Sequence, residues 1–128
     1  MRPMPVTLIT IAVGGALGAV LRYLSMQAAL RLVGPGFPWG TLLVNVAGSL
    51  IMGLAAALIL ERAGSGRLAL FLMTGVLGGF TTFSAFSLDT LYLLEKGRLA
   101  ASAFYVGGSV ILSVGALIAG LWAGRALA

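Results

Sequence analysis

The sequence predicts an all-α membrane protein with four transmembrane helices, the third of which is broken near the middle of the membrane. Composition is the first reason, because 60% of the 128 residues are hydrophobic and only 9% are charged. A water-soluble domain of this size could not bury so much apolar surface. The charges also divide the chain into four long uncharged stretches, and a polar, glycine-rich segment interrupts the third of them.

Each uncharged stretch supplies the roughly 20 apolar residues that a spanning helix requires. The stretches are residues 3–21, 32–60, 68–88 and 99–124. With their flanks, they predict one transmembrane domain, residues 1–128, with spans at about 6–32, 38–60, 68–94 and 99–126. The first stretch is too long for the core of a signal peptide, so we interpret it as a span.

Turn-forming residues separate the spans. The first span ends at Gly-Pro-Gly-Phe-Pro, residues 34–38, and a proline is tolerated in the first turn of the helix that follows. Residues 61–67 and 95–98 carry the charges of the next two loops.

The third span is the unusual one. About 27 residues would extend roughly 40 Å as a continuous helix, which exceeds a hydrocarbon core of roughly 30 Å. Its centre reads Gly-Gly-Phe-Thr-Thr-Phe-Ser-Ala-Phe-Ser, residues 78–87. A helix break within a membrane is tolerated only where protein or an aqueous cavity covers the exposed backbone. The break therefore indicates a binding or conduction site.

The residues available for chemistry are few. The chain has no Cys and no His, and its only acidic residues are Glu61, Asp89 and Glu95. Disulfides and thiolate metal sites are excluded, and we do not expect an enzyme. The net charge of +5 comes from cations that lie singly or in loose pairs between apolar runs. They flank membrane lipid and form no basic stripe, so we expect no nucleic-acid partner.

These cations do not settle the orientation. With four spans, Arg2, Arg62, Arg67 and Arg125 share one side, and Arg31, Lys96 and Arg98 lie on the other, joined by Arg22 if its side chain reaches that surface. The positive-inside rule gives almost no preference. Either a weak bias in the positive charges is enough to set one orientation, or the chain inserts in both orientations and pairs as an antiparallel homodimer. Such a dimer would bring two broken helices together at the midplane.

Polar side chains line up on the predicted helices. Thr41, Asn45 and Ser49 are four residues apart and share one face, as do Tyr105, Ser109 and Ser113. The third span adds the hydroxyls of Thr81, Thr82, Ser84 and Ser87. A lone serine in a membrane helix usually bonds to its own backbone. Asn45 is the strongest candidate site residue, because an amide in hydrocarbon must be paired or hydrated.

Arg22, Phe83 and Phe86 each have two interpretations. Arg22 lies about ten residues before the end of its span, where it either extends to the interface or places a fixed positive charge in a vestibule that attracts anions. Asp89 is a candidate counter-charge. The two phenylalanines share a helix face, where they either pack or present their positive ring edges to an anion.

Three motifs together resemble the Fluc fluoride channel family (CrcB proteins). They are Gly-Gly-Ala-Leu-Gly-Ala-Val-Leu-Arg-Tyr at 14–23, Gly-Thr-Leu-Leu-Val-Asn-Val-Ala-Gly-Ser at 40–49, and Gly-Val-Leu-Gly-Gly-Phe-Thr-Thr-Phe-Ser-Ala-Phe at 75–86. The resemblance covers nearly the whole chain. One departure is Ala85, where many members have threonine, and the phenylalanine spacing is unaffected.

The resemblance implies a dual-topology antiparallel homodimer in the bacterial inner membrane, with two pores that passively export fluoride from the cytoplasm. It implies a structural sodium ion at the dimer centre, bound by the main-chain carbonyls of Gly78 and Thr81. Arg22 would lie in the vestibule. The residues expected to line each fluoride pore are Asn45, Thr82, Phe83, Ser84, Phe86, Tyr105, Ser109 and Ser113.

Two other classes of membrane protein share part of this pattern. A proton-coupled small multidrug exporter would also be a short, four-span, dual-topology chain, but it needs a carboxylate within the membrane. The first span has none, and Asp89 lies toward the end of the third. A non-transporting assembly subunit would account for the many glycines of the spans but not for the aligned polar residues.

Overall fold

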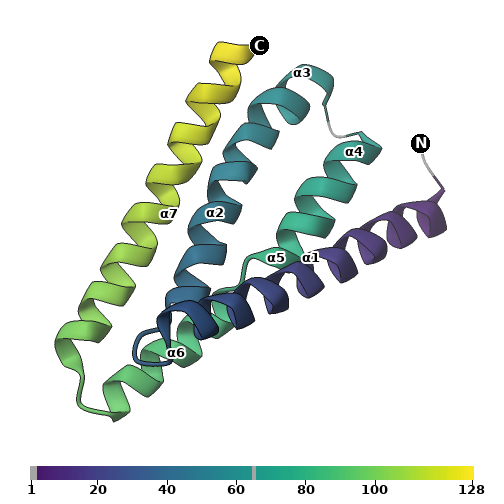
Figure 1. Ribbon diagram of the computed structural model, residues 1–128. Helices are drawn as coiled ribbons and strands as arrows, with labels where there is room; N and C mark the ends of the chain where they lie inside the picture. Colours follow the sequence, from purple (N-terminus) through teal and green to yellow (C-terminus); the bar gives the residue numbers. More distant parts are fainter. Residues whose placement is uncertain (1–2, 65) are drawn as a thin grey trace.

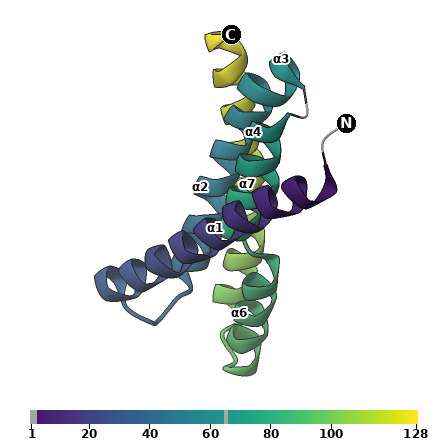
Figure 2. The same ribbon diagram turned by 90° about the vertical axis from the view of Figure 1, so that its right-hand side faces the viewer.

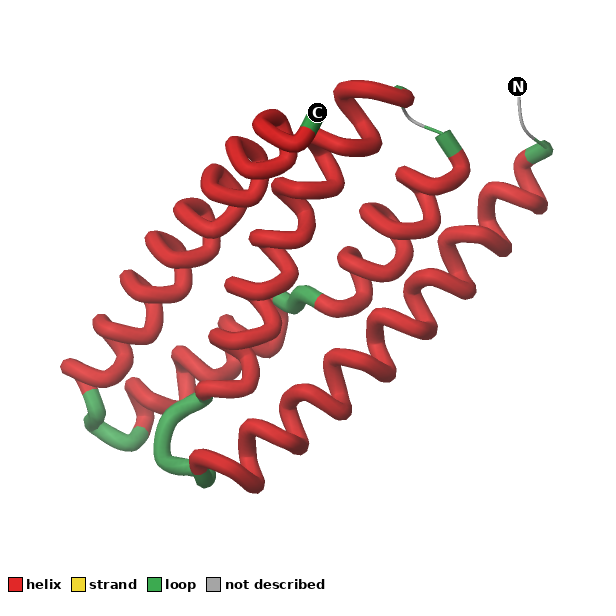
Figure 3. Tube along the Cα trace, turned by 45° about the horizontal axis from the view of Figure 1, so that its top comes forward, coloured by secondary structure: helices red, strands yellow, loops and turns green. Residues whose placement is uncertain are grey.

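The computed structural model describes residues 3–64 and 66–128, and the described chain is helical along nearly all of its length (Figure 3). Four helical segments are long and apolar enough to cross a membrane, and they are Met4–Val33, Trp39–Leu60, Arg67–Glu95 and Leu99–Leu127. The prediction of an all-α, multi-pass membrane protein is therefore confirmed. Arg2, which entered the charge balance, lies outside the described residues.

Two of these segments contain wider π-helical turns. The second segment consists of α2 (Trp39–Ala55) and the π-helical η1 (Ala56–Leu60), followed by a short α3 (Glu61–Ala63). The first and last segments are the single helices α1 (Met4–Val33) and α7 (Leu99–Leu127).

The third segment is broken, as predicted. It begins as α4 (Arg67–Ala69), continues through the π-helical η2 (Leu70–Leu77) and α5 (Gly78–Phe80), and resumes as α6 (Phe83–Glu95). Between α5 and α6 the backbone is extended, with φ −83° and ψ 155° at Thr81 and φ −150° and ψ 114° at Thr82. This interruption is visible as a short loop in the middle of the bundle (Figure 3).

The helices form two closely packed pairs. Helix α2 runs alongside α7, while α1 lies against η2 and α5 and crosses the bundle obliquely (Figures 1 and 2). Both ends of the described chain lie at the end of the bundle where α3 turns into α4, and the loops that follow α1 and α6 lie at the other end (Figure 1). Many apolar side chains face outward, such as Ile111 and Trp122, as lipid or a partner helix requires.

Glycines allow this close packing. A Cβ atom on Gly14 would lie 2.5 Å from the main-chain oxygen of Phe71 and 3.0 Å from the Cα of Gly75. On the other pair, a Cβ on Gly53 would collide with the backbone of Leu117 in α7. The glycines of the spans thus bring helix backbones into direct contact, as small residues do in membrane bundles.

An ion pair joins the ends of two spans. Arg125 donates two hydrogen bonds to the Glu61 carboxylate, at 2.9 Å and 2.7 Å. The hydrogen bond from Arg125 holds the pKa of Glu61 below its ordinary value. Both side chains are exposed, so we assign the pair little weight in the stability of the fold.

Replacing Gly14 by alanine should destabilise the bundle, because the added methyl group would press on the Phe71 carbonyl. We expect a loss of about 1–3 kcal/mol in unfolding free energy, measured in detergent, as is typical of overpacked interiors. Gly15→Ala is the matched control, since its Cβ would meet nothing closer than the Gly75 oxygen at 4.0 Å. Equal losses in both variants would contradict the close-packing argument.

Candidate functional site

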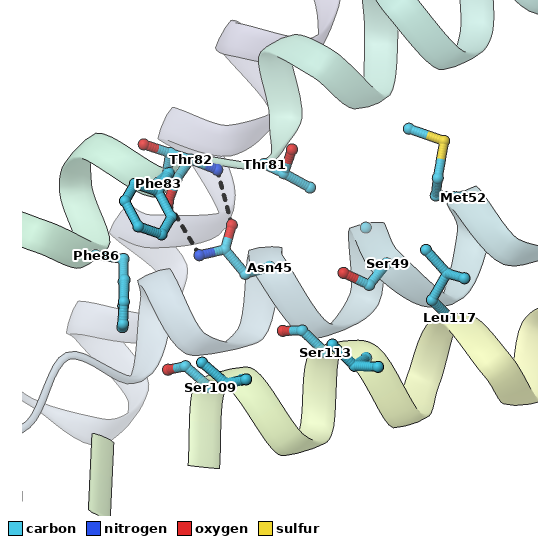
Figure 4. Close-up of a pocket in the computed structure, with 13 residues that line it drawn as sticks. Asn45, Ser49, Met52, Thr81, Thr82, Phe83, Phe86, Ser109, Ser113 and Leu117 are labelled. Carbon is cyan, nitrogen blue, oxygen red and sulfur yellow. Dashed lines mark hydrogen bonds between the residues drawn. The ribbon is translucent and has the colours of Figure 1, made fainter. Parts of the chain in front are cut away.

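Asn45 of α2 holds the break in the third span open. Its Nδ2 donates to the main-chain oxygen of Thr82 at 3.0 Å, and its Oδ1 accepts from the Thr82 N–H at 2.7 Å. One side-chain amide therefore satisfies both main-chain groups of a residue that is extended inside the bundle (Figure 4). This meets the requirement that backbone polar groups at membrane depth have partners within the protein.

These bonds free two carbonyls from their helical donors. In a continuous helix the Thr82 N–H would bond to the Gly78 carbonyl, but here it bonds to Asn45. The Ala85 N–H would likewise bond to the Thr81 carbonyl, but it donates to Thr82 Oγ1, 3.1 Å away, in a helix cap. The carbonyls of Gly78 and Thr81 thus lack the donors that a regular helix would supply.

Arg22 of α1 binds the same break. Its Nε donates to the Gly79 carbonyl at 3.0 Å, beside the C-terminal end of α5, where positive charge is favourable. Its side chain is partly buried there. No ion pair joins Arg22 to Asp89 among the residues the structure describes. Asp89, the candidate counter-charge from the sequence, therefore does not pair with Arg22.

A groove of about 330 Å³ opens beside the break, between α2, the start of α6 and α7. Its aromatic end holds Phe83 and Phe86, and Met52 and Leu117 lie toward the other end (Figure 4). The polar side chains that line it come from three spans and are Asn45, Ser49, Thr81, Thr82, Ser109 and Ser113. Most of the polar residues that the sequence aligns on separate helices therefore line one groove.

The hydroxyls in and around this groove differ in how they are bonded. Thr81 Oγ1 donates back to the Leu77 carbonyl at 2.9 Å, and the Ser87 hydroxyl, outside the groove, donates to the Phe83 carbonyl at 3.0 Å, as isolated hydroxyls in helices commonly do. Ser109 does not, and its buried Oγ has no hydrogen-bond partner in the described chain. A buried hydroxyl without a partner is costly unless a ligand or water completes it.

The two phenylalanines occupy different environments. Their ring centroids are 5.4 Å apart with planes tilted by 55°. Phe86 also packs against Tyr105, with ring centroids 5.3 Å apart, whereas the Phe83 side chain is 78% exposed. One copy of the chain therefore leaves the groove open beside Phe83.

Two expected pore residues, Tyr105 and Ser84, and the expected vestibule residue Arg22 do not line the groove. Tyr105 is fully buried behind Phe86, where its hydroxyl donates to Asp89 Oδ2 at 3.0 Å. Ser84 lies 3.2 Å from Thr82 Oγ1, within hydrogen-bond distance, and Arg22 bonds to Gly79 as described. The Tyr105–Asp89 pair was not foreseen, because no spacing along the chain links these two residues.

Gly48 also contributes to the site, although its sequence position within the second span gives no sign of this. A Cβ there would collide with the Thr81 side chain and lie 3.2 Å from the Phe80 ring. The glycine three residues after Asn45 thus makes room for the break that Asn45 holds.

Four apolar spans identify a multi-pass membrane protein, and the polar groove at its interrupted helix is a candidate site for a small polar solute or ion. Residues 9–121 match the family described as CrcB-like protein, Camphor Resistance (CrcB). The chain belongs to this family.

Its relatives carry a functional name. The protein named fluoride-specific ion channel FluC from Paracoccus denitrificans is 58% identical over 121 residues, covering 94% of this chain and 96% of the relative. The protein of the same name from Agrobacterium fabrum is 52% identical over 118 residues, covering 91% and 94%. One from Rhizobium etli is 56% identical over 119 residues, covering 92% and 95%.

The substitution Asn45→Leu should destabilise the break, because it leaves the Thr82 N–H without a partner. We expect a loss of about 1–3 kcal/mol, the usual cost of an orphaned buried donor, and faster amide hydrogen exchange at Thr82. Ser49→Ala is the control, since Ser49 lies one turn away in the same groove. If the two variants unfold and exchange alike, Asn45 does not hold the break.

Proposed function

We propose that this protein is a fluoride-selective channel that lets fluoride leave the cytoplasm passively across the bacterial inner membrane. The observation that carries the proposal is family membership: relatives more than half identical over nearly the whole chain are named fluoride-specific ion channels. That name describes ion channels, which agrees with the expectation that the chain is not an enzyme.

The groove offers the chemistry that fluoride needs. Fluoride is small and strongly hydrated, so a pore must replace its water with donors while binding weakly enough to release the ion. The Asn45 amide uses one N–H on Thr82, and its second N–H is available to the groove. The Ser109 hydroxyl and the edges of Phe83 and Phe86 are the other positive groups at this place.

A second, antiparallel copy would complete the pathway. The groove is open beside the exposed Phe83, and the cations of the sequence are almost evenly divided between the two sides. Two inverted copies would form two grooves related by a two-fold axis, and each chain would supply the wall that the other lacks.

A sodium ion at the centre of this dimer fits the carbonyls available. Gly78 and Thr81 have lost their helical donors, and two copies would offer four neutral oxygens to a hard cation. No cluster of three or more acidic, His or Cys side chains that could hold a metal occurs in the described chain, so main-chain oxygens are the plausible ligands. Bound there, sodium would join the two breaks.

Liposomes loaded with equal fluoride and chloride test the function. With ion-selective electrodes and a potassium ionophore to balance charge, the reconstituted protein should release fluoride rapidly and retain chloride, because its relatives are named fluoride-specific channels. Release of both ions at similar rates, or of neither, would overturn the proposal.

The same assay tests the aromatic end of the groove. Phe86→Ile should lower the fluoride rate at least tenfold, because it removes a ring edge from the path. Phe104→Ile is the matched control, since that phenylalanine is 61% exposed and lies outside the groove. If Phe86→Ile conducts like the control, Phe86 serves packing alone.

Dual topology is tested by labelling single cysteines with an impermeant reagent. Cysteines placed in the loop of residues 95–98 should react from both sides of the membrane in cells, because the charge balance favours neither orientation. Labelling from one side only would refute the antiparallel dimer and leave fluoride conduction to be judged by the efflux assay.

A further inference from the structure

A second polar pocket lies at the loop end of the bundle, away from the groove. It has a volume of about 120 Å³, and its charged lining residues are Asp89, Lys96 and Arg98. The loop that follows α1 forms one wall of it through Pro35, Gly36 and Pro38. The Arg98 guanidinium bonds to the Gly36 carbonyl, which fixes this loop to the loop between α6 and α7.

Contacts connect this pocket to the groove. Phe86 lines the groove and packs on Tyr105, whose hydroxyl donates to Asp89 Oδ2. Asp89 in turn lines the loop-end pocket. A continuous series of side chains therefore runs from the groove, past one aromatic layer, to the surface between the two loops.

The loop-end pocket carries a net positive charge. Lys96 and Arg98 outnumber Asp89, and both cations are exposed. In the described parts of the chain the one ion pair is that of Glu61 with Arg125, so neither cation forms an ion pair with Glu95 or Asp89. A pocket whose lining has an excess of positive charge raises the local concentration of anions.

We propose that this pocket is the second mouth of the anion pathway, and that Lys96 and Arg98 attract fluoride to it. The inference rests on the proposed function, which supplies the anion. It gives these two residues a role beyond flanking the membrane, and it places the layer of Phe86 and Tyr105 between the groove and the mouth.

Single-channel fluoride current in planar bilayers tests the proposal, at fluoride concentrations well below saturation. Lys96→Gln should lower the current about threefold at low ionic strength, the factor that one unit charge gives at roughly 6 Å in water. Lys96→Glu should lower it by the square of that factor, about tenfold. An impermeant salt at about 1 M, where the Debye length is about 3 Å, should bring all variants close to the wild type.

Two further variants separate attraction of anions at the mouth from loss of the loop contact and from general surface charge. Arg98→Lys keeps the charge but loses the planar guanidinium that bonds to Gly36, so its current should stay near the wild-type value if charge is what matters. The double variant Arg62→Gln/Arg67→Gln removes two cations that do not line this pocket and that lie at the opposite end of the same chain. Its current should stay close to the wild-type value, although an antiparallel partner would place its own copies of these two residues on the same membrane face as the pocket.

The outcomes are distinct. A wild-type protein that carries no fluoride refutes the proposed function itself. A conducting wild type with unchanged current in Lys96→Gln and Lys96→Glu at low ionic strength refutes the mouth alone. Equal losses in the Arg62→Gln/Arg67→Gln control would assign the effect to general surface charge and would also overturn the proposal.

Discussion

The pair of hydrogen bonds between Asn45 and Thr82 is the interaction on which the site depends. A helix inside a membrane cannot simply stop, because each exposed N–H and carbonyl needs a partner. Asn45 supplies both partners for Thr82 from a neighbouring helix, and this lets the backbone extend for two residues. The redirected backbone frees the Gly78 and Thr81 carbonyls, places Phe83 and Phe86 on a new helix, and leaves the Gly79 carbonyl to Arg22.

Close backbone packing makes that interaction possible. Asn45 has a short side chain, so α2 must lie near the broken span for its amide to reach Thr82. Gly48 provides the space for Thr81 and Phe80 on the α2 side, and Gly14 and Gly75 bring α1 against the first half of the broken span. The glycines and the asparagine therefore act together. The glycines bring the helices close to one another, and at this short distance the Asn45 amide reaches the backbone of Thr82.

The fold followed largely from the sequence, because membrane spans are governed by length and polarity. The break was also predictable, since two glycines and four hydroxyls in a 10-residue stretch are unfavourable in a lipid-facing helix. The four-residue spacing aligns Asn45 with Ser49 and Ser109 with Ser113, and the structure brings both pairs into one groove. What the spacing could not supply was pairing between helices. Tyr105 bonds to Asp89, and Arg22 bonds to a carbonyl; each choice depends on how the helices are rotated about their axes, which no single-helix pattern encodes.

The unpartnered hydroxyl of Ser109 has a thermodynamic consequence. A buried donor with no acceptor raises the free energy of the empty protein, and an anion that accepts from it removes this penalty only while it is bound. Occupancy of the site and folding are then linked equilibria, so the folded state gains stability as the logarithm of anion concentration once the site begins to fill. Under the proposed function, this linkage would make the protein most resistant to unfolding when fluoride is most abundant.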